Sequence, residues 1–254
     1  MNMSDTLVSV IMPTYNSAKT IADSVFSIVN QTYEDLELII IDDCSRDNTV
    51  DIIKKEFNDN RIIVKRLSLN SGAGIARNEG IKLAKGRFIA FCDSDDRWLQ
   101  DKLVKQIGFM KKHDVSLTYT SYFICDEQGN KTHKVQAIPE LNYNILLKNN
   151  YMGCLTVVYD SKKLGKYFFP EYRKRQDWAL WLILLQVVPS AKGISEPLAL
   201  YRRSNNSLSS NKVKLIKETF RFYNNLNMNV IKSLMWLVKY MYYYYDKKKL
   251  INRL

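Results

Sequence analysis

The chain has 254 residues, 46% of them hydrophobic, and a formal net charge of +12, which predicts a folded domain with a sizeable core and excludes a disordered chain. No apolar run approaches the ~18 residues that cross a bilayer, and the first run, residues 7–12, is too short for a signal peptide. The four cysteines form no CxxC pair, which argues against a structural zinc and for a reducing, cytoplasmic compartment.

Apolar strands alternate with amphipathic helices through the first hundred residues. The predicted strands are residues 7–12, 36–41, 62–64 and 88–92, and the predicted helices between them are residues 18–29, behind a Ser17 cap, 50–57 and 75–83. Such alternation predicts an α/β fold with a Rossmann-like, doubly wound, mainly parallel sheet. Ligands then bind beyond the carboxyl ends of the strands.

The pattern loosens after residue 98. It predicts a helix to residue 113, a β segment at 115–125, a short helix at 141–147, a strand at 154–159 and an apolar helix at 176–188. From residue 212 the composition shifts to Lys, Asn, Tyr and Met, which predicts two helices outside the sheet. We therefore expect a catalytic domain at 1–211, divided into halves 1–97 and 98–211 for nucleotide and acceptor, and basic amphipathic helices at 212–254.

Three acids, Asp93, Asp95 and Asp96, follow the buried strand at 88–92. Residues two apart in an extended chain project to the same side, so Asp93 and Asp95 can converge, and Asp96 can join them once the chain turns. Oxygen ligands of this kind suit Mg²⁺ or Mn²⁺ held together with substrate phosphates. A solvated acidic turn is the alternative that these residues alone leave open.

Two other strand ends carry polar residues, Pro13-Thr14-Tyr15-Asn16 and Asp42-Asp43. A carboxylate at a strand end can accept hydrogen bonds from a base or a ribose, and Asp43 is the residue expected to contact the base. The alternative is that this acidic pair only precedes the next helix, with Ser45 or Asp47 as its N-cap.

The segment Gly72-Ala73-Gly74-Ile75-Ala76-Arg77 is similar to a dinucleotide-binding fingerprint. Arg77 stands where the third glycine should permit close packing of helix on sheet, so a nicotinamide cofactor is not expected. What remains is a helix N-terminus with free amides, next to which Arg77 can act as counter-charge to a phosphate.

Two later segments are candidates for catalysis and diphosphate binding. Asp177 begins an apolar helix, where it is either a cap or a catalytic base. Arg202 and Arg203 follow a strand, where they lie in a solvated loop or neutralise a diphosphate.

Taken together, these motifs resemble the family 2 inverting glycosyltransferases over roughly residues 7–209. The matching segments are Pro13-Thr14-Tyr15-Asn16, Gln31-Thr32-Tyr33, Asp42-Asp43, residues 70–80 and Asp93-Ser94-Asp95-Asp96. The resemblance implies the GT-A fold, nucleoside contacts by Pro13, Thr14 and Tyr15, and base contact by Asp43. It implies ribose and metal binding by Asp95 and Asp96, with Asp93 completing the acidic run, and it makes Asp177 the expected base. The chain departs from the family pattern at Gln176, which replaces an acid, and at Tyr201-Arg202-Arg203-Ser204, which lacks a histidine.

The implied reaction is transfer of a sugar from a nucleotide-diphosphate donor, expected to be a UDP-sugar, to a hydroxyl of a glycan or lipid-linked acceptor in a bacterial surface polysaccharide. One direct displacement, assisted by Mn²⁺ or Mg²⁺, would invert the anomeric centre. A nucleotidyltransferase or other nucleotide-binding enzyme is the first alternative. A basic nucleic-acid-binding module is the second, although the predicted crevice is acidic and no nucleic acid partner is expected.

The C-terminal segment combines an apolar, aromatic face with Lys232 and Lys239 on the opposite side of a helix. Such a segment can lie on an anionic membrane surface, which predicts peripheral attachment to the inner face of the cytoplasmic membrane. Packing on the catalytic domain or in a dimer is the alternative, and the oligomeric state stays open.

Overall fold

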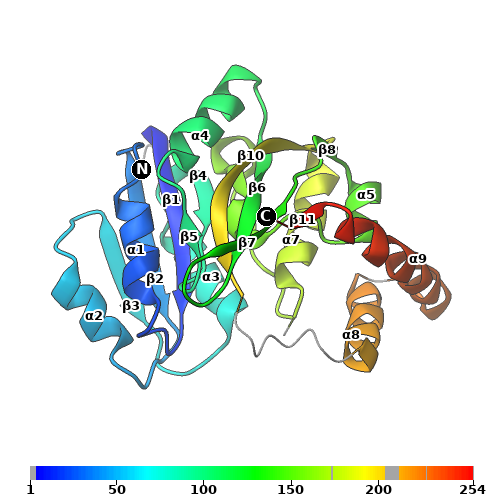
Figure 1. The fold of residues 1–254 in the computed structure, drawn as a ribbon, viewed down its shortest axis with the longest axis horizontal. Helices are drawn as coiled ribbons and strands as arrows, with labels where there is room; N and C mark the ends of the chain where they lie inside the picture. The colour runs from blue at the N-terminus through cyan, green and yellow to red at the C-terminus, as the bar shows by residue number, and fades with distance from the viewer. Residues whose placement is uncertain (1–3, 173, 204–211, 227, 254) are drawn as a thin grey trace.

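The computed structural model describes residues 4–172, 174–203, 212–226 and 228–253 (Figure 1). A single sheet runs through them with the strand order β11-β7-β6-β9-β4-β1-β2-β3. These strands are β1 (Ser4–Thr14), β2 (Leu36–Asp42), β3 (Ile62–Arg66), β4 (Gly86–Phe91), β6 (Leu117–Cys125), β7 (Lys131–Val135), β9 (Val158–Asp160) and β11 (Ile251–Arg253). β10 (Ala191–Arg202) lies off this path and pairs with β6, β5 (Arg97–Trp98) and β8 (Glu140–Leu141).

The centre of the sheet is parallel, as the sequence predicts. β1 pairs in parallel with β2 and β4, and β2 pairs in parallel with β3. Beyond β4 the direction changes, because β9 runs antiparallel to both β4 and β6. The central strands are buried on both faces and are therefore continuously apolar, which is the pattern that made them recognisable. The predicted α/β class with a mainly parallel sheet is confirmed.

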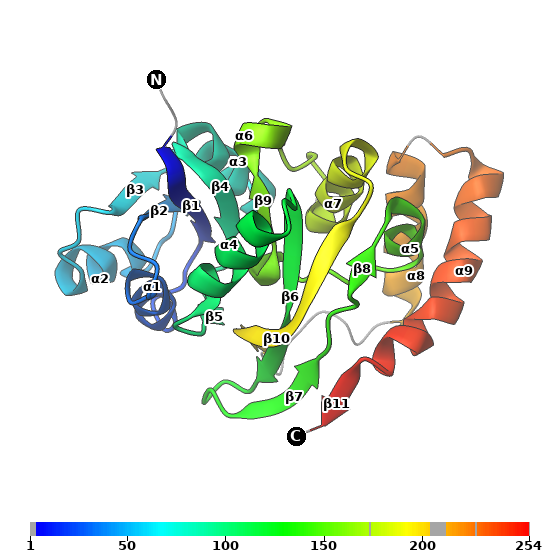
Figure 2. The ribbon, with the colours of Figure 1, turned by 90° about the horizontal axis from the view of Figure 1, so that it is seen from above.

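Helices cover both faces of the sheet (Figures 1 and 2). Val8, Val10 and Met12 of β1 point into the hydrophobic core beneath α1 (Ile21–Val29), α2 (Thr49–Glu56) and α4 (Lys102–Lys112). Alternation along the strand sends Ile11 to the other face, into the core beneath α3 (Ala73–Leu83), α5 (Tyr143–Lys148) and α7 (Gln176–Val187). The short elements η1 (Cys154–Thr156) and α6 (Ser161–Leu164) flank β9.

Two predicted helices differ in detail from the structure. α1 begins at Ile21, because the amides of Thr20 and Ile21 both donate to the carbonyl of Ser17 in a preceding turn. In α3 the predicted apolar residues Ile75 and Leu83 are each 37% exposed. Gly80 faces the sheet instead, where a Cβ would lie 2.5 Å from the Ile11 side chain, so the close approach of α3 to β1 depends on small residues.

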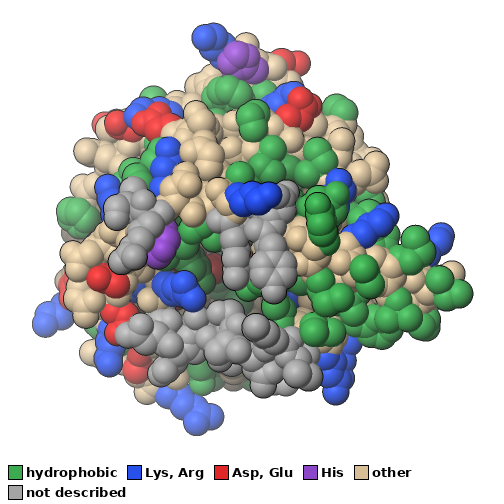
Figure 3. Space-filling model, turned by 45° about the vertical axis from the view of Figure 1, so that its right-hand side comes forward, with side chains coloured by type: hydrophobic (Ala, Val, Ile, Leu, Met, Phe, Trp, Pro, Cys, Tyr) green, Lys and Arg blue, Asp and Glu red, His purple; other side chains and the backbone are tan. Residues whose placement is uncertain are grey.

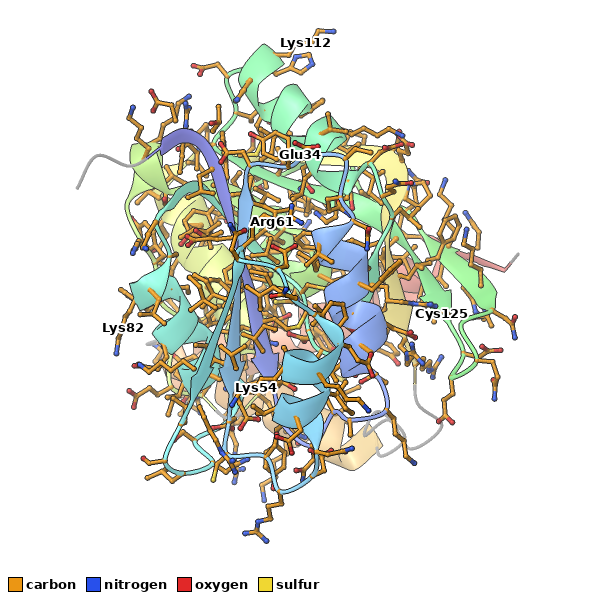
Figure 4. All side chains as sticks on the ribbon, turned by 90° about the vertical axis from the view of Figure 1, so that its left-hand side faces the viewer. Glu34, Lys54, Arg61, Lys82, Lys112 and Cys125 are labelled. Atoms are coloured by element: carbon orange, nitrogen blue, oxygen red, sulfur yellow. The ribbon has the colours of Figure 1, made fainter. Side chains whose placement is uncertain are left out.

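Arg61 contacts the segments that connect the parallel strands at their amino ends (Figure 4). Its guanidinium pairs with Asp59 at 2.7 Å and donates to the carbonyl oxygens of Val29 at 2.8 Å and Glu34 at 3.4 Å. One side chain thus links the end of α1, the start of β2 and the start of β3.

The C-terminal segment forms α8 (Lys212–Asn225) and α9 (Val230–Lys248), as predicted, and ends in β11, which was not predicted. β11 pairs antiparallel with β7 and so extends the sheet, as Figure 2 shows. Trp178 of α7 stacks on Phe222 of α8 with ring centroids 4.2 Å apart and lies 5.9 Å from the ring of Tyr240 in α9. Residues 212–253 therefore share both the sheet and the core with the rest of the chain.

Gly193 in β10 is a position where the fold admits no side chain. A Cβ there would lie 2.0 Å from the carbonyl oxygen of Ile138. We expect Gly193→Ala to lower the free energy of unfolding by about 1–3 kcal/mol, because the backbone must shift. Gly108 in α4 has nothing within 4 Å of its Cβ position, so Gly108→Ala should raise that free energy by about 0.5–1 kcal/mol. Urea unfolding measures both, and unchanged stability of Gly193→Ala would contradict this packing.

Candidate active site

A cleft of about 690 Å³ opens at the carboxyl ends of β1, β2 and β4. Ligands of α/β proteins bind beyond the carboxyl ends of the parallel strands, and the sequence predicts its candidate residues there. Seven of them line the cleft: Pro13, Thr14, Tyr15, Asp43, Arg77, Asp93 and Asp95. Asp96, Asp177, Arg202 and Arg203 are not part of its lining.

The carboxylate of Asp43 organises one wall of the cleft. It is buried, and its two oxygens accept from the backbone amides of Ser71 and Gly72, each at 2.7 Å. These bonds fix the loop that leads into α3. The N-cap of α2 is Asn48, and neither Ser45 nor Asp47, although Asp47 accepts from the amide of Thr49 at 3.1 Å. The contact between Asp43 and a nucleotide base remains a prediction. It would use the carboxylate lone pairs that are not engaged by Ser71 and Gly72.

The acidic run after β4 forms a tight turn in which the amide of Asp96 donates to the carbonyl of Asp93 at 3.0 Å. Ser94 is held from the opposite wall by the hydroxyl of Ser17 at 2.7 Å. Burial, together with the charge of Asp93, raises the pKa of Asp95. Burial and the charges of Asp95 and Asp93 raise the pKa of Asp96 well above its usual value. Asp96 is buried, Asp93 is half-buried and Asp95 is exposed, so the turn crowds three carboxylates where the core of the protein meets solvent.

A divalent cation fits this set of donors. Buried carboxylates whose charge is unfavourable gain stability from a cation placed among them. In the described part of the chain no three Asp, Glu, His or Cys side chains converge closely enough to hold a metal ion by themselves. Mg²⁺ commonly takes one or two carboxylates and completes its shell with substrate phosphates and water, so the site suits an ion that arrives with a diphosphate.

Arg77 lies at the back of the cleft, with 7% of its surface exposed. Its guanidinium pairs with Asp93 at 2.6 Å and lies 5.2 Å from the ring centre of Phe169. Its Nε is buried and has no hydrogen-bond partner among the residues that the structure describes. Burial alone would lower the pKa of Arg77. The negative charge of Asp93 outweighs this and raises that pKa, with smaller contributions that include Asp177, so Arg77 stays cationic.

Asp177 stands in the first turn of α7, which begins after Arg175 in the left-handed region (φ 61°). Its Oδ2 accepts from Nδ2 of Asn150 at 2.9 Å. The orientation of the Asn150 amide is itself fixed, because its Oδ1 accepts from the amide of Met152 at 3.1 Å. The structure therefore holds Asp177 half-buried in one orientation, close enough to Arg77 to affect its charge.

Arg202 has a structural role that the sequence did not reveal. Its Nε and the two terminal nitrogens donate to the carbonyl of Asp95, the carbonyl of Glu127 and the carboxylate of Asp23. Its backbone amide donates to Asp96 at 3.1 Å. A diphosphate contact by its side chain, which remains a prediction, would require it to give up some of these bonds. The side chain of Arg203 is exposed, and its contact with a diphosphate is likewise a prediction.

Asn150, Ser17 and Ser94 belong to the site but were not among the predicted residues. Asn150 lies in a polar stretch, and its position opposite Asp177 comes from the packing of α5 against α7. Ser17 and Ser94 are 77 residues apart in the chain. No local pattern marks such partners, because they meet only through tertiary structure.

The arrangement defines a class of protein: a glycosyltransferase of the GT-A fold, whose sheet presents a proline loop, an acidic turn and a helix-borne aspartate at one edge. The chain belongs to a family of that class, since the model described as "Glycosyl transferase family 2" matches residues 9–169. The resemblance seen in the sequence is thereby confirmed. The protein is an enzyme that transfers glycosyl groups, which decides against a nucleotidyltransferase and a nucleic-acid-binding module.

Similar proteins cover nearly the whole chain. It is 44% identical over 237 residues to the "Putative teichuronic acid biosynthesis glycosyltransferase TuaG" of Bacillus subtilis (strain 168), covering 92% of this chain and 94% of that protein. It is 40% identical over 240 residues to the "UDP-Glc:alpha-D-GlcNAc-diphosphoundecaprenol beta-1,3-glucosyltransferase WfgD" of Escherichia coli, covering 94% of each. The structure of S. aureus TarS 1-349 in complex with UDP-GlcNAc superimposes with a TM-score of 0.70 and 22% identity over 92% of this chain and 71% of that one. This likeness confirms the GT-A fold.

Proposed function

We propose that this enzyme transfers a sugar from a UDP-sugar to a hydroxyl group of a glycan or lipid-linked saccharide, in the assembly of a bacterial surface polysaccharide. The observation that carries the proposal is the cleft in which Asp43, Asp93 and Asp95 face Pro13, Thr14 and Tyr15. The names of similar proteins support the substrates: WfgD takes UDP-Glc and a diphosphoundecaprenol-linked GlcNAc, and TuaG is assigned to teichuronic acid biosynthesis.

The donor is proposed to lie along the cleft with its base toward Asp43 and its diphosphate toward the acidic turn. Pro13, Thr14 and Tyr15 would contact the nucleoside, and Asp93 and Asp95 the ribose side. Asp95 and Asp96 would hold Mn²⁺ or Mg²⁺, which when bound supplies the positive charge that stabilises a leaving diphosphate. Arg77, buried and cationic, would keep Asp93 in place and place a positive charge beside the diphosphate.

The acceptor side is assigned to Asp177. In a single displacement, the acceptor oxygen bonds to the anomeric carbon, the bond from that carbon to the diphosphate oxygen breaks, and the diphosphate leaves with the electron pair. The carboxylate of Asp177 would take the acceptor proton. Attack opposite the leaving group inverts the anomeric configuration. The hydrogen bond from Asn150 engages Oδ2 of Asp177, and Oδ1 would take this proton.

Thermal stabilisation and hydrolysis of nucleotide-sugars test the donor assignment. UDP-sugars should raise the melting temperature in Mn²⁺ and less so with EDTA, and one of them should be hydrolysed slowly without acceptor. GDP- and dTDP-sugars are the matched controls. Stabilisation by another nucleotide and none by UDP would overturn the choice of base.

Asn150 offers a sharper test of the acceptor side. We expect Asn150→Ala to lower kcat about 10- to 100-fold while leaving the donor KM unchanged, because the lost hydrogen bond to a charged group is worth about 1.5–3 kcal/mol. Steady-state kinetics at saturating acceptor measure this. Asn144→Ala, at an exposed position of α5, is the matched control. Equal activity of the two variants would contradict a role of Asn150 in holding the base.

Attachment of the enzyme to the inner face of the cytoplasmic membrane is also proposed, since a lipid-linked acceptor is confined to a membrane. Within the described residues, no helix has both the length and the apolarity to cross a bilayer. The proposed attachment is peripheral and would use a surface of the folded chain.

A further inference from the structure

Helix α9 presents two different apolar faces. Ser233, Leu237 and Tyr240 are buried against the rest of the protein. The other face, here named the α9 stripe, is left in solvent, and its side chains are between 39% and 73% exposed. The α9 stripe consists of Ile231, Leu234, Met235, Val238, Met241 and Tyr242. Figure 3 shows hydrophobic side chains gathered on the right of this view, over α9.

The positions of the lysines relative to the α9 stripe follow from helical geometry. At about 100° per residue the six stripe residues span an arc of about 120°. Lys232 and Lys239 lie along one border of this arc, between it and the buried face, and both are exposed. Lys148 of α5 lies on the same side, 4.5 Å from the ring centre of Tyr243. This corrects the expectation from sequence, which set the two lysines on the side of the helix opposite its apolar face.

Charge selects the partner of this surface. Residues 212–254 hold ten basic residues and two acidic ones, a net charge of +8 out of the total of +12, and residues 219–245 contain no Asp or Glu. In a symmetric dimer the same patch meets itself, so two copies of a basic segment would be brought together, and its net positive charge opposes such an association. An anionic lipid surface complements both features, since it accepts apolar side chains at the acyl boundary and attracts lysines to its headgroups.

We propose that α9 lies in the plane of an anionic phospholipid membrane, with the α9 stripe inserted and Lys148, Lys232 and Lys239 at the headgroups. The stripe is joined to the site through Tyr240, whose ring lies 5.9 Å from that of Trp178, the neighbour of Asp177. The membrane would thus hold a lipid-linked acceptor beside the base, a consequence that rests on the proposed function. Binding to lipid itself does not.

Flotation of the full-length protein with phosphatidylglycerol–phosphatidylcholine vesicles tests the proposal. The wild type should float with these vesicles and far less with pure phosphatidylcholine. The triple variant Ile231→Ser, Val238→Ser, Tyr242→Ser removes three exposed side chains and should lose at least about tenfold in partition coefficient. The pair Lys232→Glu, Lys239→Glu should lose about as much at low salt, since each lysine contributes to attraction by an anionic surface. Retention of binding by either variant would overturn the proposal.

Controls separate membrane binding from folding, dimerisation and catalysis. Phe26→Ser changes an equally exposed apolar residue on α1 and should float like the wild type. All variants should melt and hydrolyse nucleotide-sugar without vesicles as the wild type does, because the stripe side chains are exposed. A wild type that sediments as a dimer, becomes monomeric in the stripe variant and binds no vesicles would show that a second copy covers the stripe. Flotation without any nucleotide-sugar activity would contradict the proposed function but would still support membrane binding by the α9 stripe.

Discussion

Asp177→Asn should lower kcat by about 10²–10⁴-fold, the range that a positioned general base contributes. Asparagine has nearly the same shape but cannot accept the acceptor proton at neutral pH. The donor site lies on other elements, β1, β2 and the turn after β4, so the variant should bind UDP as the wild type does. Steady-state transfer rates measure the loss, and titration calorimetry with UDP and Mn²⁺ measures donor binding.

Asp51→Asn is the matched control for this substitution. Asp51 is also an aspartate in the first turn of a helix, is exposed, and lies on α2. Both changes remove a carboxylate that interacts favourably with a helix N-terminus, so the control accounts for that part of the effect on stability. If Asp177→Asn kept transfer within a few-fold of Asp51→Asn, Asp177 would not be the base.

The parts of the site that the sequence predicted are those fixed by local pattern. Strands β1, β2 and β4 are buried on both sides and read as continuous apolar runs, so the polar residues just after them could be placed at one edge. Thr14, Asp43 and Asp95 were found in this way, and the structure brings them to the same cleft.

What the sequence did not reveal depends on partners distant in the chain. Arg202 carries a charge typical of diphosphate sites, but its guanidinium is engaged by Asp23, 179 residues earlier. β7 and β11 are the last two strands at one end of the sheet, and both are short and largely polar, so neither has an apolar run. In α3 the face toward the sheet includes Gly80, which fits under Ile11; hydrophobic spacing correctly selected Ile81, which is buried, but also selected Ile75 and Leu83, which are exposed.

Trp178 tests whether the C-terminal helices form one cooperative unit with the catalytic core. Its indole is 1% exposed, stacks on Phe222 at an interplanar angle of 18°, and donates to the carbonyl of Leu146 at 2.9 Å. Arg175 lies 5.2 Å from the ring centre of Trp178 and 5.1 Å from that of Tyr240. The N-terminal turn of α7 thus contacts α9 through Arg175 and α8 through the stacking of Trp178 on Phe222. Trp178→Ala should lower the free energy of unfolding by about 3–5 kcal/mol.

Urea unfolding of Trp178→Ala, followed by circular dichroism, would decide between two organisations. In one cooperative unit, the variant unfolds in a single transition at lower urea, because losing the contact destabilises the sheet and the helices together. An independent appendage would unfold first, in a separate transition, and leave the main transition near that of the wild type. Trp236→Ala is the control, because Trp236 is only partly buried in α9, and it should cost far less. Since Trp178 follows Asp177 in α7, a single transition would also mean that Asp177 is held in place by α8 and by α9, the helix with the α9 stripe.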